Sequence, residues 1–221
     1  SKSAWAFTIS NFNPTDDWTR VFLKSDKVIP VLYSNLSTVK SVSEATNNPV
    51  PYAIAEIIKV VAMSRITDTY GPIPYSKIGA DGKITIPYDS QEDVYNKFFE
   101  ELNQAIEILT ENSGSALVAT ADYVYSGNVA KWIKFANSLK LRLAIRVAYA
   151  NKTLAQEMAE SAVKHEFGVI ESNADNAKWN YFGTIPNPLY TAVRYNEETS
   201  GGDSHVAADI VCYMNGYSCL L

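Results

Sequence analysis

Apolar residues recur at helical spacing along several stretches of the chain. In the segment 52–65 they gather on one face, which consists of Ile54, Ile57, Ile58 and Val61. The segment 90–110 carries a similar stripe, and Ser90 with Asp93 three residues later forms a capping pair at its start. The segment 128–149 carries two stripes, which predicts a helix that is covered on two sides at the centre of the core.

Shorter helical patterns and irregular loops fill the rest of the sequence. An early helix is expected over 18–43 with a break at Pro30, because proline lacks an N–H group and clashes inside a helix. The later helical segments are 154–165, 188–195 and 203–215. Proline, glycine and tyrosine interrupt the pattern at 69–75 and 172–188, and a turn is expected around Asp81. Because the helices come in pairs, we predict an all-α fold, a tetratricopeptide-like scaffold of helical hairpins with long irregular loops.

Charge and composition exclude several classes of function. The chain has 221 residues, of which 47% are hydrophobic, and 24 acidic against 19 basic residues give a net charge of −5. This apolar content supports a packed core and argues against intrinsic disorder. Because the basic residues do not cluster, no nucleic acid is expected as a partner. No apolar run approaches the roughly 20 residues that a membrane-spanning helix needs.

The cysteines and histidines do not have the arrangement of a metal site. A structural zinc site usually needs a second pair of ligands beside Cys212 and Cys219, but the sequence has no further cysteines and its two histidines are His165 and His205. A disulfide between the cysteines would close a very short loop and add little stability. We therefore expect free thiols, no bound metal and no cofactor.

Aromatic residues give the strongest indication of a ligand. Trp179, Asn180 and Tyr181 lie in an irregular stretch, where ring planes could stack on the C–H faces of sugars and the amide could bind hydroxyl groups. The alternative is that these rings fasten the loop to the helices. Tyr70 and Tyr75 flank two prolines in a rigid loop and are further candidates for ligand binding, again with packing as the alternative.

The charged residues indicate pairing rather than catalysis. Arg142 and Arg146 lie one turn apart in the segment 128–149, and arginine inside a helical core usually pairs with a carboxylate. The candidate partners are Asp68, Glu100 and Glu101. A late loop contains three acidic residues, Glu197, Glu198 and Asp203, and two of them could form the acid/base pair of a glycosidase. Neighbouring glutamates beside a Ser-Gly-Gly sequence are more typical of a solvated loop, and no nucleophile or nucleotide-binding motif is present, so we expect no enzyme.

Five segments match, in order, the motifs of one protein family. Residues 68–75 read Asp-Thr-Tyr-Gly-Pro-Ile-Pro-Tyr, and residues 86–92 read Ile-Pro-Tyr-Asp-Ser-Gln-Glu. Residues 122–128 read Asp-Tyr-Val-Tyr-Ser-Gly-Asn, and Asn-Pro-Leu-Tyr stands at 187–190. The most specific match is Trp-Ile-Lys-Phe-Ala-Asn-Ser-Leu-Lys-Leu-Arg-Leu-Ala-Ile-Arg at 132–146. With these motifs the chain resembles the SusD/RagB-like outer-membrane nutrient-binding lipoproteins.

The resemblance implies a cell-surface protein that captures glycans or similar nutrients. Members of this family are largely helical, sit on a SusC-like TonB-dependent transporter and are tethered to the outer membrane through a lipidated N-terminal cysteine. That cysteine is absent from this chain, which begins at Ser1. Similar proteins continue beyond the helix that carries Met214 with Asp-Pro-Arg and a long further region. We therefore expect residues 1–221 to be the N-terminal part of a SusD-like domain whose C-terminal region is missing.

Three functions remain open at this point. The favoured one is a non-enzymatic protein that binds an oligosaccharide or similar nutrient and delivers it to the SusC-like transporter. Its expected ligand-binding residues are Trp179, Asn180, Tyr181, Tyr70 and Tyr75. A helical scaffold that only docks on the transporter would show no affinity for sugars. A glycoside hydrolase fragment would release reducing sugars.

Overall fold

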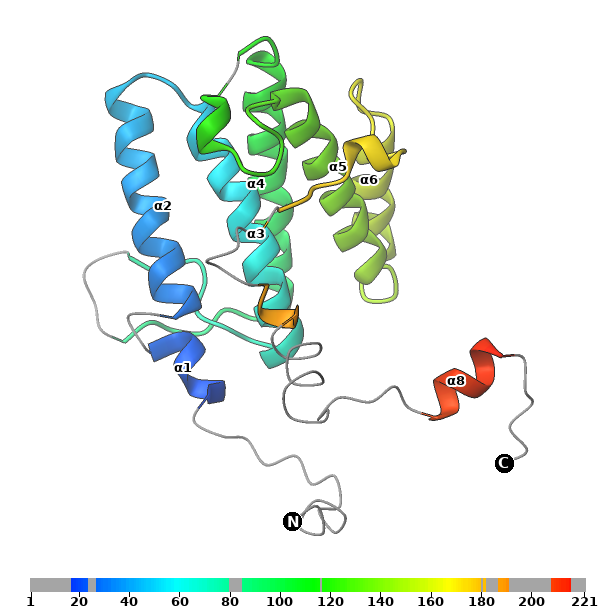
Figure 1. Cartoon of the computed structure of the whole chain (residues 1–221). Helices are drawn as coiled ribbons and strands as arrows, with labels where there is room; N and C mark the ends of the chain where they lie inside the picture. The colour runs from blue at the N-terminus through cyan, green and yellow to red at the C-terminus, as the bar shows by residue number, and fades with distance from the viewer. Residues whose placement is uncertain are drawn as a thin grey trace. The chain divides into compact units, whose positions relative to one another are not determined.

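The computed structural model describes residues 17–23, 27–79, 85–115, 117–179, 181, 187–190 and 208–215. This part of the chain is built from helices, shown in chain order in Figure 1. The α-helices are α1 (Asp17–Leu23), α2 (Val28–Ala45), α3 (Val50–Tyr70), α4 (Gln91–Glu111), α5 (Val129–Arg146), α6 (Lys152–Val163) and α8 (Ala208–Met214). Two short 3-10 helices are η2 (Ala119–Ala121) and η3 (Asn173–Asp175). The chain divides into two compact units, Ser1–Ala177 and Lys178–Leu221.

Helices of the first unit pack in the order of the sequence. From α1 to α6, each α-helix contacts the next one along the chain, and Figure 1 shows α2, α3 and α4 as neighbouring long helices. Because successive helices joined by loops pack against each other, the unit consists of helical hairpins. This arrangement confirms the predicted all-α fold class.

Side-chain caps fix where three of these helices begin. The Ser90 hydroxyl accepts a hydrogen bond from the Asp93 N–H at 3.1 Å and donates one to the Asp93 carboxylate at 2.7 Å. The predicted capping pair is therefore confirmed. Asn128 and Asn151 cap α5 and α6 in the same way, since their side-chain oxygens accept from the N–H groups three residues later.

The early helix begins differently from the prediction. Pro30 does not break a helix, because α2 begins at Val28 and Pro30 lies in its first turn. The N–H groups of a first turn have no partner within the helix, so a proline there costs no hydrogen bond. The expected turn at Asp81 and most of the segment 188–195 lie outside the described residues, although 188–190 are helical.

The core lies along α3, α4 and α5. Its fully buried side chains include Ile57, Phe98, Leu102 and Ile133. Both α4 and α6 pack against α5, which confirms the prediction of a helix covered on two sides. Two members of the predicted stripes are exposed, Ile58 at 45% and Ile145 at 65%. Within the described residues, no helix is both long and apolar enough to span a membrane.

Candidate ligand-binding site

The two tyrosines of the proline loop contact other parts of the protein. The Tyr70 ring meets Trp18 and Phe22 edge-on, with centroids 5.4 and 4.9 Å apart, and its hydroxyl donates to the Trp18 carbonyl at 2.9 Å. Tyr75 is only 4% exposed, its ring packs edge-on against Phe98, and its hydroxyl donates to the Glu101 carboxylate. The ring of Tyr75 is therefore not available for stacking on a sugar, and the ring and hydroxyl of Tyr70 are engaged with α1.

Asp89 holds this loop against the start of α4. Its carboxylate accepts from the N–H groups of Tyr75 and Ser76 at 3.1 and 2.6 Å and from the Ser76 hydroxyl at 2.9 Å. Ile73 and Asp89 also form an isolated antiparallel bridge. The loop begins at Gly71, whose φ of +76° lies in the left-handed region that favours glycine. These contacts fix Tyr75 beside α4.

The aromatic segment of the second unit has exposed rings. Trp179 is 55% exposed and Tyr181 is 45% exposed, and Tyr190 further along is 48% exposed. Asn180, between the first two, lies outside the described residues. Asn187 accepts a hydrogen bond from the Leu189 N–H at 2.8 Å, which closes a turn. The structure thus places the candidates in two groups, with Tyr70 and the buried Tyr75 in the first unit and the exposed aromatics in the second.

A buried carboxylate organises the loop before α5. Both oxygens of Asp122 accept hydrogen bonds at 2.8–3.1 Å. The donors are the N–H groups of Val124, Tyr125 and Gly127 and the indole N–H of Trp132. Burial alone would raise the pKa of Asp122, but these hydrogen bonds outweigh it and hold the pKa below its ordinary value. The motif at 122–128 therefore has a structural role.

Polar residues from three helices meet where α3 ends and α4 begins. The guanidinium of Arg146 lies 2.8 Å from the Asp68 carboxylate and donates to the Tyr95 hydroxyl at 3.2 Å. Tyr95 in turn donates to Asp68 at 2.6 Å. The expected arginine–carboxylate pair is thus confirmed for Arg146, whereas Arg142 is exposed and forms no ion pair within the described part of the chain. A cavity of about 540 Å³ opens beside this group.

A second polar group was not foreseen from the sequence. The ammonium of Lys59 lies 2.5 Å from Glu56 and 2.9 Å from Glu101, and Lys59 is only 6% exposed. A cavity of about 500 Å³ adjoins this group between α2, α3 and α4. The signal in the sequence is a charged pair, Glu56 and Lys59, inside an otherwise apolar helical segment. Their partner Glu101 is distant in sequence, so its part could not be inferred.

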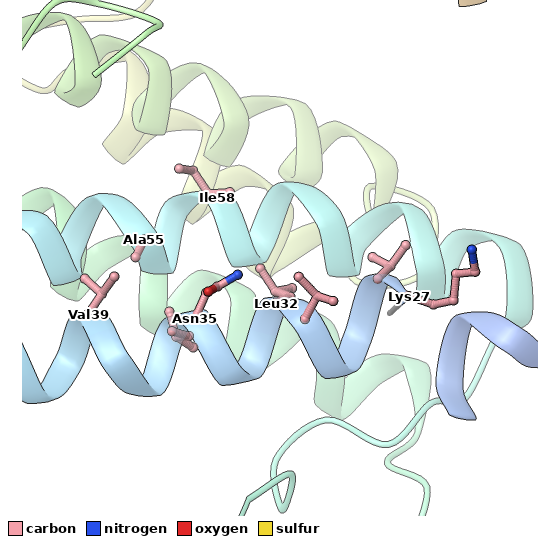
Figure 2. A pocket seen from close by; sticks show the side chains of 9 residues that line it. Lys27, Leu32, Asn35, Val39, Ala55 and Ile58 are labelled. Carbon is pink, nitrogen blue, oxygen red and sulfur yellow. The ribbon is translucent and has the colours of Figure 1, made fainter. Parts of the chain in front are cut away.

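An apolar groove runs along the outer side of the α2–α3 hairpin. It has a volume of about 570 Å³, and Figure 2 shows residues from both helices along it, among them Leu32, Val39 and Ile58. Val28 and Val31 also line it and are 47% and 40% exposed. A groove with so few polar groups is more suited to contact with protein than to binding a sugar.

The described residues contain no group that could bind a metal ion through three or more His, Cys, Asp or Glu side chains. Cys212 is a free thiol, and Cys219 lies outside the described residues. The acidic residues Glu197, Glu198 and Asp203, considered as a glycosidase pair, lie outside them too.

Comparisons with known proteins identify the family. The SusD-like family model, described as Susd and RagB outer membrane lipoprotein, matches residues 1–219. A SusD homolog from Bacteroides uniformis is 75% identical with a TM-score of 0.87, over 96% of this chain and 43% of its own. A SusD homolog from Bacteroides vulgatus is 33% identical with a TM-score of 0.74, over 91% of this chain and 38% of its own. A chitin-binding SusD homolog from Flavobacterium johnsoniae is 37% identical with a TM-score of 0.63, over 77% of this chain and 35% of its own.

The chain thus spans less than half the length of these solved relatives. No curated protein matches it. The family model covers nearly the whole chain and agrees with the resemblance found in the sequence motifs. The chain therefore belongs to the SusD-like family of SusD and RagB outer membrane lipoproteins, which are binding proteins and not enzymes.

Proposed function

We propose that the full-length protein captures an oligosaccharide or similar nutrient at the cell surface and delivers it to a SusC-like TonB-dependent transporter. Family membership supports the general role, and one solved relative is described as chitin-binding. The observation that carries the assignment of the site is the exposure of two aromatic rings, Trp179 and Tyr181, two positions apart. The protein performs no covalent chemistry in this proposal.

Binding would use the two kinds of surface that a sugar ring presents. The C–H faces of the ring stack on the planes of Trp179 and Tyr181, which releases water from apolar surface. The hydroxyl groups need donors and acceptors, and the amide of Asn180 supplies both. Tyr70 and Tyr75 serve a different purpose in this scheme, because their rings and hydroxyls are engaged with the protein. They position the proline loop.

Tethering by a lipidated N-terminal cysteine forms part of the proposal, because the matching family consists of outer membrane lipoproteins. A lipid chain would anchor the protein to the membrane, while the helical scaffold remains accessible to ligand and transporter.

A second candidate function is a scaffold that docks on the transporter without binding sugar. The apolar groove between α2 and α3 favours it, because Val28, Val31 and Ile58 expose apolar surface there. Exposed patches of this kind are typical of surfaces that contact another protein. The two functions differ in one measurable respect, since only the first requires affinity for a glycan.

The test compares full-length wild-type protein with the variants Trp179→Ala and Tyr181→Ala on a panel of oligosaccharides that includes chitin fragments, using calorimetry. We expect each variant to lose about tenfold in affinity, which corresponds to about 1.4 kcal/mol. Tyr149→Ala is the matched control, because Tyr149 is fully exposed in the first unit. Unchanged affinity in both variants would remove the aromatic site from the proposal. No affinity for any glycan, with a retained transporter complex, would favour the docking scaffold.

A further inference from the structure

A polar cavity inside the helical scaffold has features that the fold itself does not require. It occupies about 500 Å³ between α2, α3, α4 and the proline loop. The residues that matter for its chemistry are Tyr33, Lys40, Tyr52, Glu56, Lys59 and Glu101. Its volume falls within the roughly 300–1,000 Å³ that is usual for small-molecule sites.

The buried charges beside this cavity are more numerous than an ion pair needs. Lys59 is 6% exposed and contacts two carboxylates, Glu56 and Glu101, at 2.5 and 2.9 Å. One carboxylate would suffice to neutralise it, and burying a further charge is costly. Burial raises the pKa of Glu101 in spite of the opposing effect of Lys59. Burying the second carboxylate therefore lowers the stability of the fold, and binding of a ligand would account for its presence.

The tyrosine hydroxyls around the cavity are not all engaged. Tyr75 donates to Glu101, and Tyr52 lines the cavity together with Glu56. Tyr33 lines the same cavity, and its hydroxyl forms no hydrogen bond with any described residue. Burial raises the pKa of Tyr33, and the charges of Glu101 and Glu56 raise it further. Tyr33 thus keeps its proton and can donate it to a group in the cavity.

The balance of charge decides which class of ligand fits. Glu56 and Glu101 carry two negative charges, and Lys59 and Lys40 carry two positive ones. Lys97 at the rim is paired with Glu100 at 2.6 Å. With no excess of either sign, the cavity favours neither a cation nor an anion. It offers donors and acceptors side by side, which match the neighbouring hydroxyl groups of a neutral sugar.

We propose that this cavity binds a neutral monosaccharide, or one sugar unit of a longer chain, at a subsite separate from the aromatic segment at Trp179. The inference rests on the proposed function for its substrate class. In the bound state the Tyr33 hydroxyl and the Lys59 ammonium donate to sugar oxygens, and the carboxylates of Glu56 and Glu101 accept from sugar hydroxyls.

Saturation-transfer NMR on the full-length protein tests the subsite directly. The probes are D-glucose, D-galactose and N-acetyl-D-glucosamine, with glucuronate and glucosamine as charged counterparts. We expect transfer to at least one neutral sugar and at least fivefold weaker binding of that sugar by Tyr33→Phe. This substitution removes a hydroxyl without a protein partner, so the fold should survive. Tyr149→Phe, at a fully exposed tyrosine, is the matched control and should bind like wild type.

A second variant, measured together with its melting curve, separates a loss of sugar binding from a loss of stability. Glu56→Gln keeps the shape of the side chain and should also weaken sugar binding, with the melting curve reported beside it. The inference is overturned if wild type shows no transfer to any neutral sugar, or if Tyr33→Phe and Glu56→Gln both bind like wild type. It is also overturned if Trp179→Ala alone abolishes monosaccharide binding, a result that would leave the proposed function intact. Monosaccharide binding that depends on Tyr33, without affinity for any longer glycan, would support the subsite and count against the aromatic site.

Discussion

At the scale of single residues, one carboxylate determines the shape of a whole loop. Asp122 accepts four N–H groups, and the loop that it gathers passes so close to Leu117 that a Cβ at Gly127 would lie 2.3 Å from the Leu117 carbonyl oxygen. Gly127 has a φ of +84°, so glycine meets both the steric and the conformational demand there. The same carboxylate receives the indole N–H of Trp132, which joins the loop to α5.

Asp122→Asn should destabilise the protein by about 2–3 kcal/mol, because one oxygen is replaced by an amide donor that faces two N–H groups. The lowered pKa of Asp122 in the folded state means that its stabilisation is present above the unfolded pKa. That stabilisation is lost as the pH falls through the folded value. Urea unfolding at pH 7 and pH 3 measures the difference in the free energy of unfolding between wild type and Asp122→Asn. We expect this difference to be smaller at pH 3.

Glu107→Gln provides the control for this measurement, because Glu107 is exposed on α4 and also loses a carboxylate. Its stability should stay within about 0.5 kcal/mol of wild type. If the difference in the free energy of unfolding between wild type and Asp122→Asn were the same at both pH values, the ionised Asp122 carboxylate would not have the stabilising role assigned to it.

At the scale of the elements, local signals were enough to find the helices. The capping pair of Ser90 and Asp93 and the apolar stripe after it lie within a few residues of each other, so the start of α4 could be predicted. The role of Pro30 could not be predicted in this way. Proline is favoured in the first turn of a helix but breaks a helix in its interior, and which of these applies depends on where α2 begins. The ion pair of Arg146 was foreseen with Asp68 as one of three candidate partners, but the sequence could not choose among them because all three lie in other helices.

Ser90→Ala should lower the stability by about 1 kcal/mol, because the N–H of Asp93 loses its acceptor at the exposed start of α4. Ser90→Thr should retain most of the stability, since its hydroxyl can accept from the Asp93 N–H and donate to the Asp93 carboxylate as serine does. Chemical denaturation of both variants beside wild type measures the two effects. Equal loss in both would show that the cap is unimportant and that the substitution acts in another way.

At the scale of the whole molecule, the candidate site was harder to predict than the fold. Trp179 and Tyr181 are exposed and Tyr75 is buried, and the sequence reasoning that named all three as candidates could not separate them. Burial of Tyr75 depends on Phe98 and Glu101 in α4, and these contacts arise only when the hairpins pack. The polar cavity at Lys59 could not be predicted either, since its carboxylates and tyrosines come from α2, α3 and α4 and meet only when these helices pack.

The division of the chain into two units leads to a prediction about folding. Among the described residues, the buried core cluster extends from Ile29 to Met158 and lies wholly in the first unit. Removing residues 178–221 therefore removes no described member of that cluster. We expect a fragment of residues 1–177 to keep its helical circular dichroism and to melt cooperatively within a few degrees of the chain 1–221. A fragment of residues 1–145, which lacks α6 and its buried residues Ala155, Met158 and Ala162, is the contrasting control and should melt at clearly lower temperature. If the 1–177 fragment instead lost its cooperative transition, the second unit would have to contribute packing that stabilises the hairpins, and the two units would form one folding unit.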